Sequence, residues 1–240
     1  MLNTKNPLIA ARRAQLVEAA INLFSRSGYH VVTVKDIADE AGVSPGLIYQ
    51  YVSDKQDLLF LCLTHIVEQL KNAIPNASEG IEDPIVCLYR SVDAYGRVID
   101  ANRRYSMLTF RENKSLRPEG VEEIKRLELE TNELISARVE ACIRVGLLAE
   151  TNVELLTFRI IIAAQGWALK QWRLRDIVTL DVYLEESIHA VWRERLLPRG
   201  LLHYHELLQS GKLTAGGSND ADIVKAGEAR RQIRTTKRDA

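Results

Sequence analysis

The segment that most constrains this chain is residues 33–59, TVKDIADEAGVSPGLIYQYVSDKQDLL, because it contains three sites at which a helix can begin. Thr33 has an acidic residue three positions further on, as a capping box requires. Ser44 is followed by a proline at the first helical position, and Ser53 has Gln56 three positions further on. We therefore expect two short helices joined by the turn AGVS, and then a longer helix. This arrangement predicts a helix-turn-helix, in which the second helix projects away from the first.

The second short helix, expected over residues 45–52, is too short to carry a core face of its own. Ile48 and Val52 lie four residues apart and are expected to anchor it. Four other positions are expected to face outward: Gly46, Leu47, Tyr49 and Gln50. A glutamine can donate and accept at a base edge, and a tyrosine hydroxyl can reach a phosphate, so this face suits a DNA groove. Lys55 stands in the first turn of the next helix, where a cation opposes the helix dipole and gains nothing structurally, so a phosphate would explain its position.

The rest of the chain also reads as helices. Apolar spacing, capping residues, prolines and glycines predict helices over residues 9–27, 53 to about 74, 84 to about 100, 103 to about 114, 118 to about 145, 152–174 and 179–197. Among the expected starts are an Asp83 cap and a capping box formed by Thr151 and Glu154. Pro198 and Gly200 are expected to close the last helix.

The sequence shows no β alternation, so the predicted fold class is all-α. An N-terminal helix-turn-helix domain is expected over residues 10–70, followed by a linker, IPNASEG, near residue 74. A larger helical domain is expected over residues 71–210. Residues 211–240 are polar and poor in large apolar side chains, which predicts a mobile tail.

Charge gives little direct evidence for a nucleic-acid partner. The chain has 32 basic and 32 acidic side chains, so its formal net charge is zero. Binding would therefore depend on cations near the motif: Lys5, Arg12, Arg13 and Lys55. Arg12 and Arg13 are either ordinary solvated charges or an arm that lies on the DNA backbone.

Cysteine usage and apolar runs limit the compartment. The three cysteines lie in apolar helical stretches, and the first fifteen residues lack the apolar run of a signal peptide. No apolar run reaches the length of about 18 residues that a membrane span requires. We expect reduced thiols, a cytoplasmic location and no membrane contact.

The sequence offers no chemistry for an enzyme. It contains no Ser, His and Asp arrangement with a nucleophile elbow and no glycine-rich phosphate loop. The cysteines are too scattered for a metal site, and His203 and His205 point to different faces of a helix. Neither a metal nor a cofactor is expected.

The motif segment and the preceding LFSRSGYHVVTV are similar to the DNA-binding segment of the TetR (tetracycline-repressor-type) family of bacterial transcriptional regulators. The similarity covers about residues 10 to 70 and includes the AGVSPG turn, the LIYQY recognition helix and the SDKQDLL helix start, in that order. Two short helices alone could equally form a structural corner, but the length and order of this match favour DNA binding. Val52 stands where the family usually has Phe, which is only a packing change. Leu47 stands where the family often has a small polar residue, and this leaves the base preference unassigned.

The resemblance implies contacts for particular residues. Those at positions that touch phosphates in the family are Thr33, Ser44, Pro45, Tyr49, Tyr51 and Lys55. Those at positions that touch bases are Gly46, Leu47 and Gln50. It also implies a C-terminal domain for dimerisation and for binding a small-molecule effector. Residues 152–174 and 179–197 agree with this, because they are apolar on nearly every side and could build a four-helix bundle with a second copy.

Candidate effector-binding residues combine aromatic side chains with cations: Tyr89, Tyr105, Phe110, Arg111, Arg138, Cys142 and Trp167. The aromatic residues either line a cavity or fill a core. Arg138 lies on a largely apolar stripe, where it either extends to solvent or pairs with an anionic ligand, and Arg111 raises the same question. An apolar cavity with a cation suits a ligand with a long apolar part and an anionic end, such as an acyl-CoA thioester or a fatty or aromatic acid.

The sequence therefore predicts a ligand-responsive, homodimeric transcriptional regulator, and specifically a repressor that a small molecule releases from a palindromic operator. Two alternatives compete with this reading. A DNA-binding structural factor without an effector would be expected to be more basic. A small helical enzyme would need catalytic groups that the sequence lacks.

Overall fold

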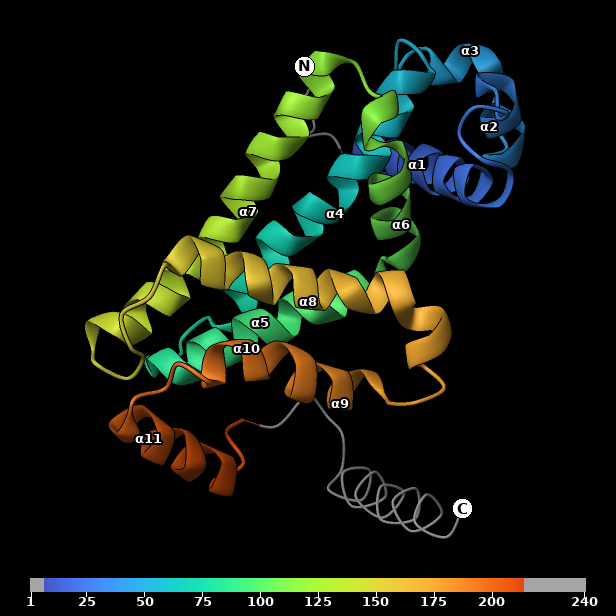
Figure 1. Ribbon diagram of the computed structural model, residues 1–240. Coiled ribbons are helices and arrows are strands. Elements are labelled where there is room, and N and C mark those ends of the chain that lie inside the picture. Colours follow the sequence, from blue (N-terminus) through green and yellow to red (C-terminus); the bar gives the residue numbers. More distant parts are fainter. Residues whose placement is uncertain (1–6, 214–240) are drawn as a thin grey trace, which may run out of the picture. The chain divides into compact units, whose positions relative to one another are not determined.

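The computed structural model describes residues 7–213, which form a succession of helices (Figure 1). The elements are α1 (Pro7–Ser27), α2 (Val34–Glu40), α3 (Pro45–Ile48), α4 (Lys55–Ala77), α5 (Pro84–Ala101), α6 (Arg103–Glu112), η1 (Asn113–Ser115), α7 (Pro118–Arg144), α8 (Val153–Leu174), α9 (Leu180–Tyr183), η2 (Leu184–His189), α10 (Ala190–Arg193) and α11 (Pro198–Gln209). An isolated bridge between Leu148 and Leu196 is the single β pairing in this part of the chain. The predicted all-α class is confirmed. None of the helices in residues 7–213 has the length and apolarity that crossing a bilayer demands.

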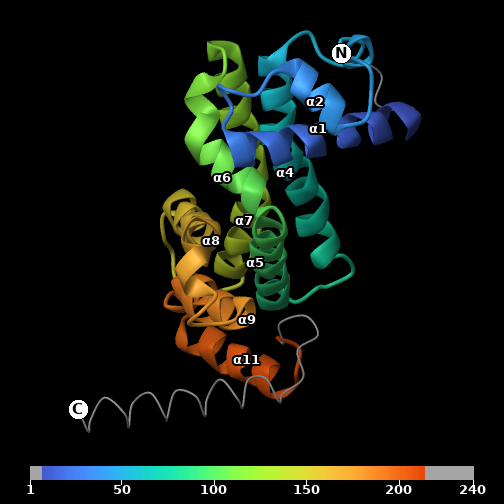
Figure 2. The ribbon, with the colours of Figure 1, turned by 90° about the vertical axis from the view of Figure 1, so that its right-hand side faces the viewer.

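The described chain divides into two compact units. Unit 1 combines residues 7–72 with 101–133, and unit 2 combines residues 73–100 with 134–213. The sequence placed the division near residue 70 and assigned all later helices to one domain. The difference arises because α6 packs against α1 (Figure 2) and contributes Tyr105 and Leu108 to the same core. A single boundary along the sequence cannot describe a unit that is built from two separate stretches of chain.

The core of unit 1 is formed mainly by apolar side chains of α1, α2, α3 and α4, with further members from α6 and α7. Its most buried members include Leu16, Ile21, Phe24, Ile37 and Leu59, each at most 1% exposed. Burying each such side chain stabilises the fold by about 1.5–3 kcal/mol. This core fixes α2 and α3 to α1 and so determines which side chains of the helix-turn-helix remain outside.

In unit 2, α8 runs beside the segment formed by α9, η2 and α10 (Figure 1). The Tyr183 hydroxyl donates to the Ala163 carbonyl at 2.7 Å, and the Tyr183 ring lies 5.0 Å from that of Trp167. The sequence predicted one continuous helix over residues 179–197. Instead, residues 184–189 form a π-helix. Apolar periodicity does not reveal the extra residue of a π turn, because the flanking helical turns keep their own spacing.

The π-helix packs closely on α5. A Cβ atom added at Gly96 would overlap the Leu184 side chain, so the absence of a side chain at this position permits the approach. The His189 ring stacks on that of Tyr89 with centroids 3.9 Å apart, and Nδ1 of His189 accepts a hydrogen bond from Nε1 of Trp192 at 3.2 Å. Burial lowers the pKa of His189 to about 3, so its ring is neutral at pH 7.

Two predicted helix ends are wrong. Helix α4 continues through Pro75 to Ala77, where a linker was expected. A proline this close to the helix end removes one hydrogen bond but does not force the helix to stop. Pro198 begins α11 instead of closing a helix, since it occupies the first turn, where proline is favoured. Gly200 follows at a point where a Cβ atom would overlap the backbone carbonyl of Leu147.

Two predicted caps are also wrong by one residue. Asp54, not Ser53, accepts the free N–H groups at the start of α4, and Asn152, not Thr151, accepts the N–H of Leu155 at the start of α8. In both cases two adjacent polar residues could have capped the helix, and the backbone geometry places the second of the two at the cap. The predicted caps at Thr33 and Asp83 are confirmed: Thr33 accepts from the Asp36 N–H, and Asp83 accepts from two N–H groups of α5. Thr179, where a helix was expected to begin, caps α9 by accepting from the Val182 N–H.

Candidate nucleic-acid interface

The helix-turn-helix of unit 1 presents a short corner, which comprises α3 and the turns that follow it as far as residue 52. Helix α3 contains a single α turn, Pro45–Ile48, and the predicted continuation to residue 52 is a series of tight turns. Backbone hydrogen bonds hold these turns, from the N–H of Tyr51 to the Ile48 carbonyl at 2.8 Å and from the N–H of Val52 to the same carbonyl at 3.1 Å. Ile48 is fully buried and Val52 is 6% exposed, as predicted for the two anchors.

The side chains predicted to contact DNA lie around this corner. Five of them are exposed: Ser44, Pro45, Gly46, Tyr49 and Gln50. Leu47 and Tyr51 are half-buried. The Ser44 hydroxyl makes no capping hydrogen bond, although the residue occupies the N-cap position, so the hydroxyl is available to a phosphate oxygen. The corner therefore offers an amide, hydroxyls and a residue without a side chain on one exposed surface.

Thr33 is placed differently from the other predicted contacts. Both its N–H and its hydroxyl donate to the Asp36 carboxylate at 2.8 Å, and this completes the capping box of α2. The two hydrogen bonds hold the pKa of Asp36 below its ordinary value. A phosphate at Thr33 would have to compete with this carboxylate for the same donors.

Lys55 has a structural role, although its place in the first turn of α4 predicted none. Its Nζ donates to three backbone carbonyls that follow α1: those of Tyr29 at 2.9 Å, His30 at 3.2 Å and Val32 at 2.9 Å. The ammonium also lies 4.5 Å from the centre of the Tyr29 ring. The statement that a cation gains nothing at this position is wrong, because these carbonyls come from residues 23 to 26 positions earlier in the chain. Lys55 joins the end of α1 to the start of α4.

Arg12 belongs to a local chain of contacts between α1 and the end of α2. Its Nη1 donates to Oε1 of Gln15 at 2.6 Å, and Nε2 of Gln15 donates to the Ala41 carbonyl at 2.6 Å, at the end of α2. This places a cation near the helix-turn-helix but with a polar partner of its own. Lys5, the other cation expected near the N-terminus, lies outside the described residues, as does the predicted tail beyond residue 213.

The start of α4 is held by two aspartates and one arginine. Asp54 accepts hydrogen bonds from the Arg117 guanidinium and from the backbone N–H groups of Gln56 and Asp57. The Asp57 carboxylate accepts one from Arg117 at 3.3 Å. Partial burial raises the pKa of Asp54, but the backbone N–H groups and the guanidinium outweigh this, so its pKa lies below the ordinary value. Arg117 was not among the predicted site residues, since nothing in its local sequence points to partners 60 residues away.

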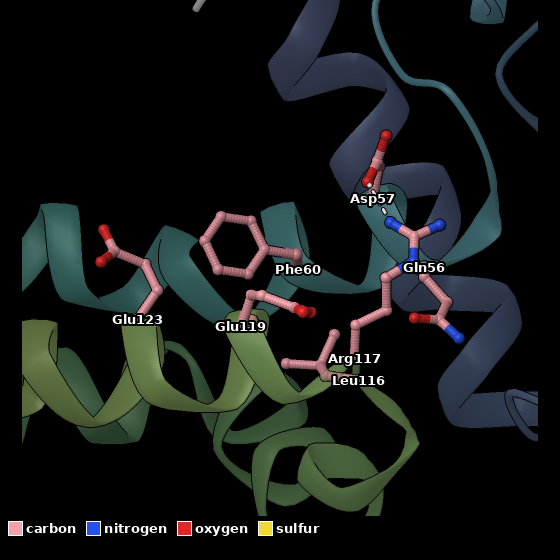
Figure 3. Close-up of a pocket in the computed structure, with 8 residues that line it drawn as sticks. Gln56, Asp57, Phe60, Leu116, Arg117, Glu119 and Glu123 are labelled. Carbon is pink, nitrogen blue, oxygen red and sulfur yellow. Dashed lines mark hydrogen bonds and ion pairs between the residues drawn. The ribbon is translucent and has the colours of Figure 1, made fainter.

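A pocket of about 340 Å³ adjoins this cluster (Figure 3). One wall comes from the first turns of α4, with Gln56, Asp57 and Phe60. The other comes from the corner before α7 and from the first turns of that helix: Leu116, Arg117, Glu119, Gly120 and Glu123. In Figure 3 the Arg117 side chain lies alongside the pocket and is joined to Asp57. The pocket is thus bounded by the same two elements that Arg117 connects.

The seven predicted effector-binding residues fall into two groups. Tyr105, Phe110 and Arg111 belong to unit 1, and Tyr89, Arg138, Cys142 and Trp167 belong to unit 2. Tyr105 is buried in the unit 1 core, where its hydroxyl donates to Glu18 at 3.0 Å and its ring stacks on His65. Phe110 is 51% exposed, and Arg111 is exposed. The seven residues therefore do not belong to one unit.

Most of the four in unit 2 have partners within the protein. The Tyr89 hydroxyl donates to Glu185 at 3.4 Å, Nε1 of Trp167 donates to Asp100 at 2.7 Å, and Sγ of Cys142 donates to the Pro84 carbonyl at 3.2 Å. Burial raises the pKa of the Cys142 thiol to about 12. Arg138 differs, because its Nη2 donates to the neutral hydroxyl of Ser78 at 3.1 Å, and its Nε is buried without a hydrogen-bond partner among the described residues.

This geometry defines a class of protein, since an exposed polar corner on a helix-turn-helix is the arrangement of DNA-binding regulators. Comparison with known proteins agrees. Residues 16–62 match the profile of the family described as bacterial regulatory proteins, tetR family. The chain is 40% identical over 197 residues to the HTH-type transcriptional regulator HbdR of Aromatoleum sp. (strain CIB), a match that covers 82% of this chain and 86% of that protein. The chain belongs to the TetR family.

Solved structures of the family share the fold. A tetR family regulatory protein from Rhodococcus RHA1 aligns with a TM-score of 0.68 at 21% identity, over 77% of this chain and 96% of that one. The fatty acid degradation regulator FadR from Bacillus halodurans aligns with a TM-score of 0.66 at 19% identity, over 79% of this chain and 97% of that one. Membership of the TetR family makes the chain a DNA-binding transcriptional regulator and not an enzyme, as predicted.

Proposed function

We propose that the protein is a repressor that binds a palindromic operator as a homodimer in the cytoplasm and is released by a small apolar anion. The observation that carries the DNA-binding part is the exposure of Tyr49 and Gln50 on a corner fixed by the buried Ile48 and Val52. Gly46, Leu47 and Gln50 face the bases, while Ser44, Pro45, Tyr49 and Tyr51 face the backbone. Thr33 and Lys55 also contact phosphates, provided that a phosphate can share the donors that now bond to Asp36 and to the backbone carbonyls.

The dimer surface is assigned to α8. Leu155 and Ile162 lie two helical turns apart on one face of this helix, and they are 60% and 63% exposed. Large apolar side chains aligned on an exposed face favour association with an identical surface. Trp167, on the same helix, is only 4% exposed and is bonded to Asp100, so it belongs to the protomer core.

Arg138 is the proposed anchor for the effector. Within the described residues it is bonded to a hydroxyl and not to a carboxylate, and it lies among the apolar helices of unit 2. A partly buried guanidinium with unused donors favours a carboxylate, a phosphate or another anionic group. Acyl-CoA thioesters and fatty or aromatic acids combine such a group with an apolar body. One protein of similar fold is named as a regulator of fatty acid degradation.

Release from DNA requires the effector to prefer one conformation of the chain. Helices α4 and α7 each contain residues of both units. An effector that binds better to one arrangement of α4 would change the separation of the two recognition corners in the dimer. Only this difference in affinity can shift operator binding.

The DNA-binding assignment is tested with operator fragments selected from random sequence. We expect Gln50→Ala and Tyr49→Ala to weaken operator binding by roughly 5- to 100-fold, because each contact is worth about 1–3 kcal/mol. Lys55→Ala distinguishes two roles, since loss of a phosphate contact lowers the salt slope by about one unit, whereas a structural role leaves the slope unchanged. Parent-like binding by both corner variants would exclude α3 as the recognition element.

The effector assignment is tested by operator release and thermal shift with acyl-CoAs, free fatty and aromatic acids, and cationic drugs. Arg138→Gln is expected to lose the response to anions, and Arg111→Gln, exposed in unit 1, serves as the matched control. Release by cations alone, or an unchanged response in Arg138→Gln, contradicts the assignment. Operator binding that ignores every ligand in the panel would favour a structural factor.

A further inference from the structure

We propose that Arg117 positions the recognition corner, although it lies outside that corner: through Asp54 and Asp57 it fixes the turn that joins the corner to α4. This role rests on the proposed recognition surface at α3. It makes operator affinity depend on a residue just before α7 that touches no DNA.

Each aspartate divides its two oxygens between the turn and Arg117. Oδ1 of Asp54 accepts the N–H of Gln56 at 2.8 Å and that of Asp57 at 3.0 Å, while its Oδ2 accepts from Nη2 of Arg117. Oδ2 of Asp57 accepts the N–H of Ser53 at 2.8 Å, while its Oδ1 accepts from Nη1 of Arg117. One planar guanidinium therefore sets the orientation of both carboxylates that hold the backbone of residues 53–57.

This turn lies directly beside the recognition corner. Val52, the second anchor of the corner, precedes Ser53 and is buried. A rotation of either carboxylate would move the N–H groups that it holds, and with them the path of the chain between the corner and α4. Positions that differ by about 1 Å at an interface are enough to reduce binding.

Arg117 is itself held in place. Leu116, its neighbour on one side, is 8% exposed and part of the unit 1 core, and Pro118 on the other side begins α7 with a fixed φ angle. The guanidinium lies along one side of the pocket, where it reaches Asp57 (Figure 3). The backbone of Arg117 is thus restrained independently of its ion pairs. The pairs can therefore transmit the position of the chain just before α7 to the turn of residues 53–57.

The competing reading is that these are ordinary surface ion pairs with little effect, since the Arg117 side chain is 50% exposed. Helix α7 supplies a matched control for that reading. Arg126, 54% exposed, forms the same type of pairs with Glu123 and Glu130 but makes no contact with the turn. Comparing the two arginines separates a positioning role from a general charge effect.

The experiment measures operator affinity, salt slope and melting temperature for the full-length Arg117→Ala, Arg117→Lys and Arg126→Ala proteins. Arg117→Ala should bind the operator roughly 5- to 20-fold more weakly with an unchanged salt slope. Arg117→Lys should recover part of the loss, because an ammonium can pair with either aspartate but cannot fork across both. Asp57→Asn combined with Arg117→Ala should be no weaker than Arg117→Ala alone, and Arg126→Ala should match the parent.

Three results would overturn the inference. Parent-like binding by Arg117→Ala, with binding weakened in Gln50→Ala, would leave the recognition surface intact and remove the role of Arg117. A salt slope reduced by about one unit in Arg117→Ala would show a direct phosphate contact. Equal losses in Arg117→Ala and Arg126→Ala would show a general charge effect. Parent-like binding by Gln50→Ala would instead overturn the recognition surface itself.

Discussion

Two carboxylates that hold the helix-turn-helix of unit 1 lie at helix ends near the surface, whereas the polar contacts of two aromatic residues in unit 2, His189 and Trp167, lie inside. Asp36 and Asp54 cap helices with carboxylates that remain open to water. In unit 2 His189 is fully buried, and the Trp167 N–H reaches Asp100 from a side chain that is only 4% exposed. Buried polar groups must be paired, and losing the pairing costs far more than losing an exposed one.

The difference follows from what each unit presents. Unit 1 must leave Tyr49 and Gln50 exposed, so its small core is supplemented by caps and by Lys55, which holds three carbonyls. Unit 2 exposes apolar side chains such as Ile162 on α8 and buries the polar contacts of His189 and Trp167. We therefore expect changes at the surface of unit 1 to affect DNA binding more than stability, and changes inside unit 2 to affect stability first.

The largest expected effect concerns the exposed apolar face of unit 2. Ile162→Glu should convert the dimer into monomers, because a carboxylate would be buried without a partner in the dimer interface. Specific operator binding should fall by roughly a thousandfold or more, towards the level of non-specific binding. Light scattering and operator titration measure the two effects. Lys170→Glu, at an exposed polar position of the same helix, is the control, and a stable Ile162→Glu dimer would reject this face as the interface.

A smaller effect distinguishes a buried tryptophan of unit 2, Trp167, from an exposed one, Trp172. Trp167→Ala should lower the free energy of unfolding by about 3–5 kcal/mol, because it empties a packed site and leaves Asp100 without this donor. Trp172, 68% exposed, should change it by no more than about 0.5 kcal/mol when replaced by alanine. Urea unfolding of the two variants gives the comparison. Similar losses at both positions would contradict the assignment of Trp167 to the core.

The smallest effect concerns a surface carboxylate of unit 1. The pKa of Asp54 is lowered in the folded protein, so its contribution to stability is present above the unfolded pKa and is lost as pH falls through the folded value. Because the side chain is 42% exposed, Asp54→Asn should cost less than about 1 kcal/mol at pH 7. The difference between parent and variant in urea unfolding should begin to narrow as pH falls below about 4, the unfolded pKa, and should vanish once pH is below the folded pKa. A difference that shows no decrease as pH falls below about 4 would mean that the charge of Asp54 is not its source.

The sequence predicted most of the features that depend on neighbouring residues, although the caps expected at Ser53 and Thr151 were wrong by one residue. The capping box at Thr33, the cap at Asp83 and the anchors Ile48 and Val52 were all correct, because each depends on partners within a few positions. The sequence also indicated the family from one continuous segment.

Features that depend on distant partners were missed or wrong. Arg117 meets Asp54 from 63 residues away, and Lys55 meets carbonyls more than 20 residues away, so no local pattern shows either contact. The effector candidates were selected by residue type along helices. Tyr105 was then found in unit 1, because a helix later in the chain packs back on α1. Sequence spacing gives the face of a helix but not the identity of the element that covers it.

We expect positions 96 and 200, both glycine here, to vary differently among relatives of this protein. The obstacle at Gly96 is the flexible side chain of Leu184, so an alanine at 96 is tolerable if residue 184 becomes smaller. The obstacle at Gly200 is the backbone carbonyl of Leu147, which no substitution can shorten. Among close relatives, position 96 should therefore vary together with position 184, whereas position 200 should remain glycine.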